Sequence, residues 1–522
     1  MVKYVHSVGL RCLEGYIVRV EADVSDGMPG MDLVGYLGSE VKEARERVRM
    51  AIKNSGFSFP LRRITLNLSP ADVRKSGTGF DLPMAVTILC SLGVLDGADT
   101  EDAVFLGELN LSGELGPIRG VLPLVLQAVK AGFRKCYVPK ENAAEAALVE
   151  QMEVYPVSTL RELTEHLKGE MMIQRMIRRN DSFPEKEAHY EFDLKYVQGQ
   201  PFARRGLEIA AAGLHNIIMV GEPGAGKSML SKCLPSILPP LTMEESLEVS
   251  SVYSVAGRFP KDGTLMKERP FVAPHHTVTD VALTGGGIMP KAGLVALAHK
   301  GVLFLDEMPE FSRSALEILR QPLEDRKIMI SRNGGNFTFP ADFMLVGAMN
   351  PCPCGAYPDR SRCSCTTAQR KRYLERLSRP LMDRIDLCIE VKNLRYEELT
   401  AGSLMEDSAT VCSRVEEAQK IQFARFSKAR FNSQMGREEI EKYCALDGEG
   451  SKLMEKAFDN YRLSARSYHR VLKVARTIAD LDHREMIESI HLIEALRFRN
   501  AGFLEDEERM ASDYLQNRKD ET

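Results

Sequence analysis

The chain contains the stretch Ile217-Ile218-Met219-Val220-Gly221-Glu222-Pro223-Gly224-Ala225-Gly226-Lys227-Ser228. Its last eight residues match the phosphate-loop pattern G-x-x-x-x-G-K-[ST], and the apolar residues before them are typical of a buried strand. Residues 228–234 favour a helix directly afterwards. This context suits the motif, because the glycines let backbone N–H groups face phosphate and the helix N-terminus adds positive potential. The stretch predicts an α/β fold that binds a nucleotide, with Lys227 on the β- and γ-phosphates and Ser228 on Mg²⁺.

A second apolar stretch, residues 301–305, ends in the carboxylates Asp306 and Glu307. We expect Asp306 to hold the hydration shell of Mg²⁺ and Glu307 to activate the attacking water as general base. A third apolar run, residues 343–349, delivers Asn350 to the same edge of the sheet, where its amide would hold that water near the γ-phosphate. Together these stretches predict ATP hydrolysis. The alternative is a set of buried core strands with incidental polar caps.

Further motifs carry a family resemblance. They are residues 274–277 (PHHT), 284–287 (TGGG), 297–307 (LAHKGVLFLDE), 350–355 (NPCPCG) and 381–387 (LMDRIDL). With them the chain resembles the YifB/ComM family of magnesium-chelatase-like AAA+ ATPases, from near the N-terminus to about residue 500. The resemblance implies ATP and Mg²⁺ as ligands and a ring-shaped, hexameric homo-oligomer. It also implies DNA as a partner, because the competence-associated members of the family are hexameric DNA helicases.

Changes of pattern along the chain divide it into five parts. We expect a first domain at 1–168, a linker at 169–191, an ATPase domain at 192–392, a helical lid at 393–504 and a polar tail at 505–522. In the first domain, strand patterns at 16–24, 63–68 and 104–108 alternate with helical patterns at 39–55, 81–92 and 121–131. By resemblance, this domain has the Lon-protease-like fold, which is ribosomal S5 domain 2-like. The ATPase domain is then a P-loop AAA+ parallel-sheet domain, and the lid is all-α.

The first domain lacks the base of an active Lon-type protease. Such proteases use a Ser and a Lys, and by resemblance the Lys would fall at Leu122, just after residues 113–120. Ser76 and Thr78 offer hydroxyl groups, but a hydroxyl without a neighbouring base is a poor nucleophile. We therefore expect a non-proteolytic domain that serves assembly or partner binding.

Two features between the phosphate loop and Asn350 indicate the subclass of AAA+ ATPase. By resemblance, the residues between Leu234 and Gly301 include the helix 2 insert, which points into the pore of the ring. The runs 327–332 and 336–339 flank a Gly-Gly pair, which predicts a β-hairpin. Arg332, near its tip, is a candidate contact for a nucleic-acid backbone. A solvated surface hairpin is the alternative.

Four cysteines, Cys352, Cys354, Cys363 and Cys365, form a candidate structural zinc site, since four thiolates make a closed tetrahedral shell. The C-x-C spacing differs from the usual C-x₂-C pairs, so free thiols are the alternative. The chain has 11 cysteines, an odd number that does not suggest a disulfide framework in a large intracellular protein.

His275 and His276 lack partners of suitable spacing for a metal site, and we expect hydrogen bonds within the insert for them. A cluster of basic residues surrounds the cysteines: Arg360, Arg362, Arg370, Lys371, Arg372, Arg376 and Arg379. It suits phosphate contact or subunit contact equally.

Two arginines complete the expected site. Arg384 matches the arginine finger of the family, whose forked guanidinium stabilises the transition state in the neighbouring subunit. A salt bridge with Asp383 or Asp386 is the alternative. Arg466 best matches sensor 2 and Arg470 is its rival, with action in cis or in trans left open.

Size and composition limit the remaining choices. A chain of 522 residues is too long for one core, and a net charge of −4 excludes a polybasic binder, so DNA would meet local patches or a ring lumen. The longest apolar run, residues 82–95, is too short to span a bilayer, and no secretion signal opens the chain. We expect a cytoplasmic protein with no membrane partner.

The combined interpretation is a ring-forming AAA+ ATPase that uses ATP hydrolysis to move DNA. By resemblance it acts as a helicase or branch-migration motor, with proteins of recombination or DNA uptake as partners. The alternatives are a chelatase-type motor subunit, a MoxR-like ATPase that remodels proteins and a protease.

Overall fold

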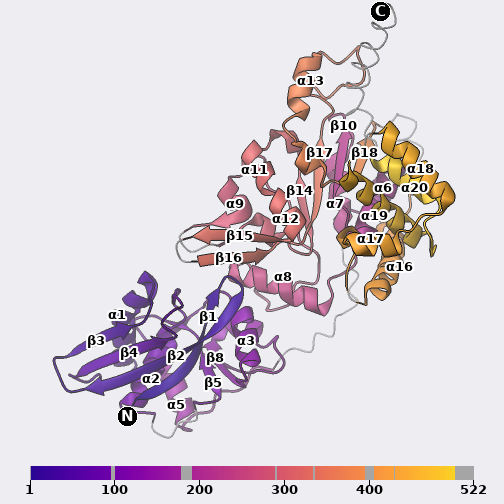
Figure 1. The fold of residues 1–522 in the computed structure, drawn as a ribbon. Helices are drawn as coiled ribbons and strands as arrows, with labels where there is room; N and C mark the ends of the chain where they lie inside the picture. The colour runs from indigo at the N-terminus through magenta and orange to yellow at the C-terminus, as the bar shows by residue number, and fades with distance from the viewer. Residues whose placement is uncertain are drawn as a thin grey trace, which may run out of the picture.

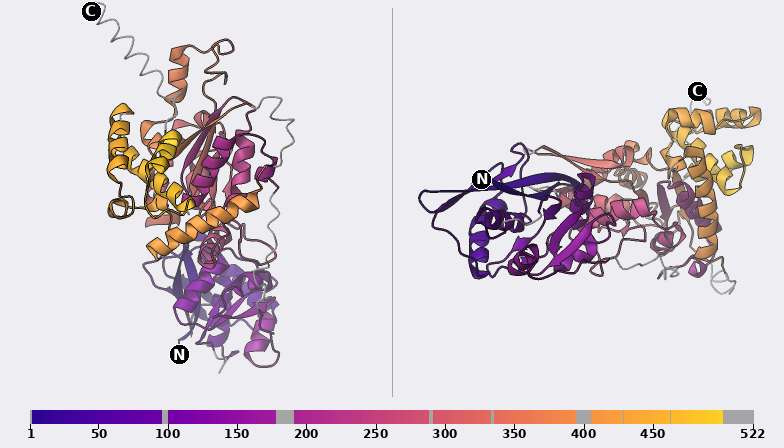
Figure 2. Two further views of the ribbon diagram at one scale, coloured as in Figure 1. Left: turned by 90° about the vertical axis from the view of Figure 1, so that its right-hand side faces the viewer. Right: turned by 90° about the horizontal axis from the view of Figure 1, so that it is seen from below.

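The computed structural model describes residues 2–95, 100–177, 191–287, 291–332, 335–393, 405–427, 429–461 and 463–499. Three regions follow one another along the chain (Figures 1 and 2). An N-terminal α/β region lies at one end of the molecule, a second α/β region with a parallel sheet lies in the middle, and helices of the C-terminal region cover one side of that sheet.

The N-terminal region is built on a seven-stranded sheet in the order β3-β4-β2-β1-β5-β8-β9. These strands are β1 (Lys3–Arg11), β2 (Glu14–Ser25), β3 (Gly30–Val34), β4 (Arg63–Ser69), β5 (Ala103–Phe105), β8 (Lys135–Pro139) and β9 (Glu153–Val157). β2 pairs antiparallel with β1 and β4, and the other neighbours are parallel. The strands predicted at 16–24 and 63–68 are confirmed. The one predicted at 104–108 is divided between β5 and β6 (Glu108–Leu109), and β6 pairs with β7 (Leu115–Gly116).

Helices cover this sheet and complete its core. They are α1 (Ser39–Asn54), α2 (Asp81–Ser91), α3 (Val121–Lys130), α4 (Ala143–Ala146) and α5 (Leu160–Leu167). The three predicted helices are confirmed. Packing also continues beyond residue 168, into the predicted linker: Ile173 is buried in the same core and Met176 pairs with Val154. Residues 178–190 of that linker lie outside the described residues.

The central region is built on a five-stranded parallel sheet in the order β11-β14-β17-β10-β18. Its strands are β10 (Ile217–Gly221), β11 (Phe271–Val272), β14 (Val302–Leu305), β17 (Met344–Met349) and β18 (Leu387–Val391). Every residue of β10, β14 and β17 is buried, as expected of a parallel sheet covered on both faces. The carboxyl ends of these three strands meet at one edge, which gathers the residues that follow them.

Helices and two small hairpins surround the sheet. The helices are α6 (Pro201–Gly213), α7 (Lys227–Ile237), α8 (Met243–Val255), α9 (Asp280–Thr284), α10 (Leu294–Leu297), α11 (Arg313–Ile318), α12 (Arg320–Asp325), α13 (Thr367–Leu374) and α14 (Arg379–Met382). One hairpin joins β12 (Gly285–Gly286) to β13 (Lys291–Ala292), within the segment predicted to contain the insert. The predicted hairpin is confirmed as β15 (Lys327–Arg332) paired with β16 (Gly335–Pro340).

The C-terminal region is helical, as predicted. Its helices are α16 (Ser408–Phe426), α17 (Arg437–Tyr443), α18 (Gly448–Asn460), α19 (Ala465–Leu481) and α20 (Ser489–Arg499). Residues of α16, α19 and α20 share one hydrophobic core with α6, α7 and β18. The lid is therefore packed on the sheet, and apolar packing runs across the predicted boundary at residue 392. The predicted tail, 505–522, lies outside the described residues.

The N-terminal and central regions meet through α3 and α8. Glu145, buried beside this contact, accepts hydrogen bonds from the Leu122 backbone N–H and the Ser254 hydroxyl. Arg11 at the end of β1 donates to the Asn336 carbonyl of the β15–β16 hairpin at 3.1 Å. The hairpin thus extends over the N-terminal region (Figure 1).

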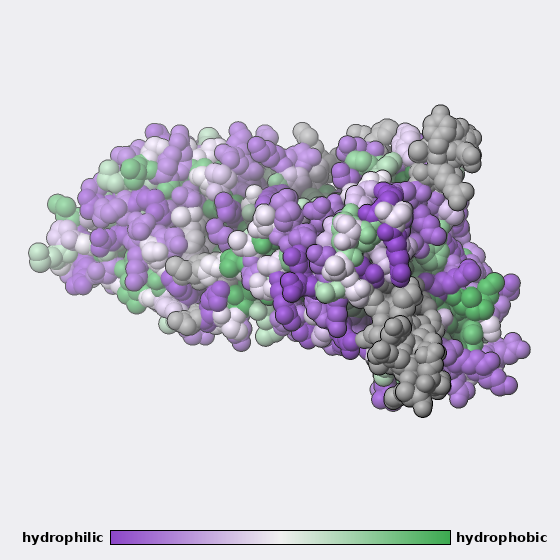
Figure 3. All heavy atoms as spheres, turned by 90° about the horizontal axis from the view of Figure 1, so that it is seen from above, coloured by the Kyte–Doolittle hydropathy of each residue, from purple (hydrophilic) through white to green (hydrophobic). Residues whose placement is uncertain are grey.

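The outer surface is mainly polar. Seen from above, the visible face is dominated by hydrophilic residues with hydrophobic ones scattered among them (Figure 3). Among the helices that the structure describes, none has the length and apolar character needed to cross a membrane.

Candidate active site

The phosphate loop connects β10 to α7 and has the conformation that its glycines permit. Gly224 and Gly226 have φ angles of 83° and 94°, in the left-handed region that side chains disfavour. A Cβ atom on Gly221 would lie 2.1 Å from the carbonyl oxygen of Val391, so glycine is required where β10 meets β18. The loop therefore turns its backbone sharply into the N-terminus of α7, where an anion can bind.

Lys227 lies at the centre of this loop and is only 8% exposed. Its ammonium group donates to the carbonyl oxygens of Gly221 at 2.7 Å and Glu222 at 2.8 Å, and to Oδ1 of Asn350 at 3.1 Å. Burial lowers the pKa of Lys227, while the nearby Asp306 and Glu307 act to raise it. The structure thus brings Lys227 and Asn350 into direct contact.

Ser228 and Asp306 form a second contact across the same edge. The Ser228 hydroxyl donates to Oδ2 of Asp306 at 2.7 Å, and the other carboxylate oxygen accepts the backbone N–H of Glu307 at 3.0 Å. A hydroxyl beside a carboxylate is a donor set that suits Mg²⁺, which takes oxygen ligands and keeps several waters. These two residues fit the metal predicted for them.

Glu307 projects from a strained turn at the end of β14. Its φ angle is 49°, and its side chain is 62% exposed. The carboxylate faces the imidazole of His276, with 3.7 Å between Oε2 and Nδ1. An exposed carboxylate next to the phosphate loop is available to a water molecule, as a general base requires.

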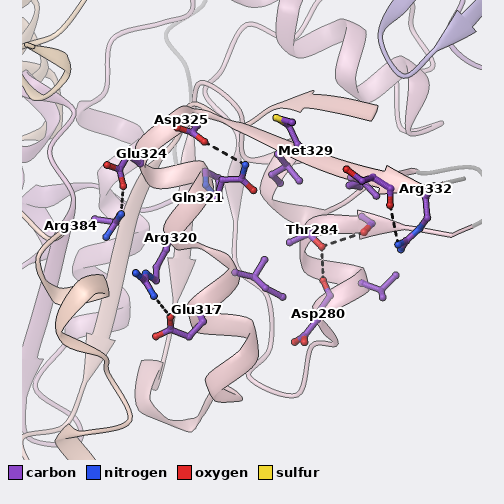
Figure 4. Close-up of a pocket in the computed structure, with 17 residues that line it drawn as sticks. Asp280, Thr284, Glu317, Arg320, Gln321, Glu324, Asp325, Met329, Arg332 and Arg384 are labelled. Carbon is purple, nitrogen blue, oxygen red and sulfur yellow. Dashed lines mark hydrogen bonds and ion pairs between the residues drawn. The ribbon is translucent and has the colours of Figure 1, made fainter. Parts of the chain in front are cut away.

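Arg384 lies elsewhere, in an open pocket of ≈ 640 Å³ between α9, α12 and β15 (Figure 4). Its side chain is 8% exposed; the guanidinium forms an ion pair with Glu324 and donates to the Pro380 carbonyl oxygen at 2.6 Å. Arg466 binds the other oxygen of Glu324 at 2.7 Å. The structure therefore places both arginines on one carboxylate of α12, away from the phosphate loop.

Asp386, one of the two alternative partners considered for Arg384, has other contacts. Asp386 is buried and forms ion pairs with Arg470 and His215. Burial by itself raises the pKa of Asp386, but the charge of Arg470 and the neighbouring His215 lower it far below its usual range. Arg470, the rival for sensor 2, is thus tied to a structural carboxylate, whereas Arg466 is 44% exposed.

Arg332 closes β15 and is exposed at the pocket rim (Figure 4). Its guanidinium lies close to Gly286 of the β12–β13 hairpin, where an added Cβ atom would be 3.8 Å away. The β15–β16 hairpin therefore lies beside the β12–β13 hairpin of the insert. Residues 288–290, between β12 and β13 in the sequence, and 333–334, between β15 and β16, are outside the described residues.

The four cysteines lie together. Their sulfur atoms are all within 4.8 Å of one another, and the Sγ atoms of Cys352 and Cys363 are 3.7 Å apart. The basic residues around them have varied contacts. Arg362 pairs with Glu222 of the phosphate loop at 3.1 Å, Arg376 pairs with Glu310 at 2.8 Å, and Arg370 stacks on Tyr357.

The N-terminal region shows a buried leucine at the expected position of a protease lysine. Leu122 is fully buried, and the Thr78 hydroxyl donates to Glu108 at 2.5 Å. Lys75, which the sequence reasoning did not consider, is also fully buried, and its Nζ has no hydrogen-bond partner among the described residues. Burial lowers the pKa of this lysine.

Sequence reasoning missed Glu324, which joins the two arginines. It named Glu222 and His276 but not their contacts: Glu222 accepts hydrogen bonds from Arg362 and Asn393, and His276 faces Glu307 and not a residue of the insert. His275 does bond within the insert, to Thr277, as predicted. A charged residue in a helix or loop carries no signal of its distant partner, so none of these contacts could be predicted from the sequence.

A glycine loop with lysine, serine, aspartate and asparagine at the edge of a parallel sheet defines a P-loop nucleotide-binding protein. Comparison with known proteins gives the family. Three family models match: "Magnesium chelatase, subunit ChlI" over residues 193–399, "Subunit ChlI of Mg-chelatase" over 20–142 and "Magnesium chelatase, subunit ChlI C-terminal" over 405–499. The chain belongs to the YifB/ComM family of magnesium-chelatase-like AAA+ ATPases.

The similarity to individual members spans most of both chains. Competence protein ComM of Haemophilus influenzae is 42% identical over 488 residues, 92% of this chain and 94% of that protein. YifB of Escherichia coli is 40% identical over 486 residues, with the same coverage of 92% and 94%. A Lon protease of Trichlorobacter lovleyi is 26% identical over 161 residues, 28% of this chain.

Proposed function

We propose that the protein is an ATPase that assembles into a ring and uses hydrolysis to move DNA. The observation that carries the proposal is the split of the expected catalytic groups. Lys227, Ser228, Asp306 and Asn350 are joined by hydrogen bonds at one sheet edge, whereas Arg384 is held by Glu324 in a separate pocket. A site divided in this way is complete only when a second subunit supplies the missing cation.

The residues at the sheet edge suit binding of a triphosphate. Lys227 now bonds to two loop carbonyl oxygens, and these bonds must be exchanged for phosphate oxygens when nucleotide binds. Ser228 and Asp306 would hold Mg²⁺, which supplies charge neutralisation at the β- and γ-phosphates. Asn350 and Glu307 would hold the attacking water, and Glu307 would accept its proton.

The arginines suit action in trans. The partners of Arg384, Pro380 and Glu324, lie outside the phosphate loop, and Arg466 shares the second of them. We propose that both arginines reach the nucleotide of the adjacent subunit, with Arg384 as the finger and Arg466 as sensor 2. A guanidinium stays charged and forms two parallel hydrogen bonds, so it can stabilise the phosphoryl group in the transition state.

The DNA substrate is supported by the two adjacent hairpins. Arg332 and the glycine-rich strand β12 lie next to each other on the pocket rim, and Lys291 of the β12–β13 hairpin is exposed. Exposed cations on narrow projections suit a phosphate backbone, which carries most of the affinity in sequence-independent binding. The ComM relative bears the name of a competence protein, which agrees with a DNA substrate.

The decisive experiment is the ATPase rate of the assembled protein with and without single-stranded, duplex and four-way-junction DNA. We expect stimulation by at least one of these DNAs. An unchanged rate, together with no DNA binding at low salt, would rule out the DNA motor. Stimulation by a tetrapyrrole-inserting or protein partner would then favour the chelatase-type or MoxR-like alternatives.

The domain division stays part of the proposal: a non-proteolytic N-terminal domain, an ATPase domain and a helical lid. The buried Leu122 supports loss of the protease base, whereas the buried Lys75 beside Ser76 calls for a direct test. Casein incubated with the protein and ATP should remain intact. Degradation that disappears in Lys75→Ala would show that the domain is a protease.

A further inference from the structure

The loop that follows Asn350, residues 351–366, contains the four clustered cysteines and is named the cysteine loop below. We propose that Cys352, Cys354, Cys363 and Cys365 bind one structural Zn²⁺ ion, and that the loaded cysteine loop holds the phosphate loop in its nucleotide-binding shape. The metal site does not depend on the proposed function. The effect of the cysteine loop on nucleotide binding rests on the proposed ATPase function.

The sulfur positions match a four-thiolate zinc shell. Zinc–sulfur bonds of about 2.3 Å in a tetrahedron require sulfurs about 3.8 Å apart. The Sγ atom of Cys352 is 3.4 Å from that of Cys354 and 3.7 Å from that of Cys363, and the Cys354–Cys363 distance is 3.6 Å. All four sulfurs, including that of Cys365, lie within 4.8 Å of one another. One ion can therefore contact all four with small movements.

The charge around the cysteine loop suits this ion. Four thiolates and one Zn²⁺ leave a formal charge of about −2, which needs cations nearby. Arg360 and Arg362 lie within the loop, and Arg370 stacks its guanidinium on Tyr357 of the same loop at 3.4 Å. These basic residues are therefore the cations available to offset the charge of the proposed zinc site.

The cysteine loop is attached to the phosphate loop at two places. Arg362 donates to Oε2 of Glu222 at 3.1 Å, and Asn393 after β18 donates to the same oxygen at 2.7 Å. The backbone of Gly355 lies against the ring of Pro223, where an added Cβ atom would approach Cδ to 2.4 Å. Any change in the cysteine loop therefore displaces residues that flank the phosphate-binding glycines.

A third attachment runs through the start of the loop. Asn350 immediately precedes it and accepts the hydrogen bond of Lys227 at 3.1 Å. A metal that closes residues 352–365 into a rigid unit would fix the position of Asn350 from one side and Glu222 from the other.

The metal is tested on the full-length protein purified under reducing conditions, by elemental analysis for zinc and iron. We expect about one zinc atom per chain, lost in the double variant Cys354→Ser/Cys363→Ser and retained in the control Cys412→Ser, whose thiol lies on α16. Titration of four reactive thiols in zinc-free wild-type protein, or iron in place of zinc, would overturn the assignment.

The coupling is tested by the dissociation constant of a fluorescent ADP analogue. We expect removal of zinc from the wild-type protein to weaken binding about tenfold, as loss of supporting contacts does at ligand sites. Arg362→Ala keeps the metal and should weaken binding by up to about fivefold, because its ion pair is exposed. Zinc loss without any change in affinity would overturn the coupling.

These readouts separate the two proposals. A protein that contains zinc but binds no nucleotide would retain the metal site and refute the proposed ATPase. A protein that hydrolyses ATP but never contains zinc would refute the metal site and leave the ATPase standing.

Discussion

Arg384 and Arg466 bind the two oxygens of the same carboxylate, that of Glu324 on α12. Arg384 precedes β18, and Arg466 lies in the first turn of α19. The fold therefore brings two residues that are far apart in sequence to the side chain of Glu324. Burial acts to raise the pKa of Glu324, but the two guanidinium charges outweigh it and lower the pKa. The two arginines therefore face the same surroundings and are expected to serve the same nucleotide.

Subunit mixing tests this shared role. Arg384→Ala and Arg466→Ala should each keep nucleotide binding, and Arg384→Ala should lower turnover about 10³-fold or more. Mixed with Glu307→Gln, either variant should regain activity, because an intact arginine then meets an intact base at some interfaces. Arg320→Ala, which removes the partner of Glu317 in the same pocket, should retain most activity. Full turnover by a stable monomer, or by Arg384→Ala alone, contradicts action in trans.

Glu307→Gln tests the general base. The amide keeps the size of the side chain but cannot accept the proton of water, so we expect turnover to fall about 10²–10⁴-fold while nucleotide binding is retained. Steady-state ATPase rates and nucleotide affinity measure the two effects. Glu310→Gln is the matched control, because this nearby carboxylate is partly exposed and pairs with Arg376. Normal turnover in Glu307→Gln would mean that another group activates the water.

Asp386→Asn tests the buried ion pairs beneath Arg384. Loss of the charge leaves Arg470 without its partner and should destabilise the fold by ~3 kcal/mol, seen as a lower melting temperature at pH 7. The folded-state pKa of Asp386 is depressed, so its stabilisation is present above the unfolded pKa of about 4 and is lost as the pH falls below it. The difference in melting temperature between the wild-type protein and Asp386→Asn should therefore become smaller at acidic pH. Asp482→Asn, at a carboxylate 44% exposed, should change the melting temperature little.

Arg332→Ala tests the hairpin as a DNA contact. Removal of one phosphate-binding cation should weaken DNA binding similarly for all sequences. It should also reduce, by about 1, the slope of the logarithm of the DNA-binding constant against the logarithm of the salt concentration. Fluorescence anisotropy at several salt concentrations measures both quantities. Lys327→Ala, at the other end of β15, is the control for a general loss of charge. Equal effects of the two substitutions would mean that the hairpin acts only through its net charge.

The phosphate loop shows how far sequence reasoning could reach. Residues 217–228 and the residues after β14 and β17 form short motifs that can be recognised in the sequence alone. Because the strands of a parallel sheet run in the same direction, their carboxyl ends lie at the same edge. Lys227, Ser228, Asp306 and Asn350 could therefore be grouped before any coordinates were known. The strand β1 was missed because its buried positions include Ser7 and Gly9, so the sequence shows no regular alternation of apolar residues.

The sequence by itself identified the short motifs, which are the phosphate loop, the two carboxylates after residue 305 and the cysteine pairs. It also identified the family to which these motifs belong. The tertiary structure decided which distant groups meet, namely Glu324 with both arginines, Arg362 with Glu222 and the lid helices with the sheet. The reason is physical. Local patterns reflect backbone geometry over a few residues, whereas an ion pair across the fold depends on the packing of all the elements between its partners.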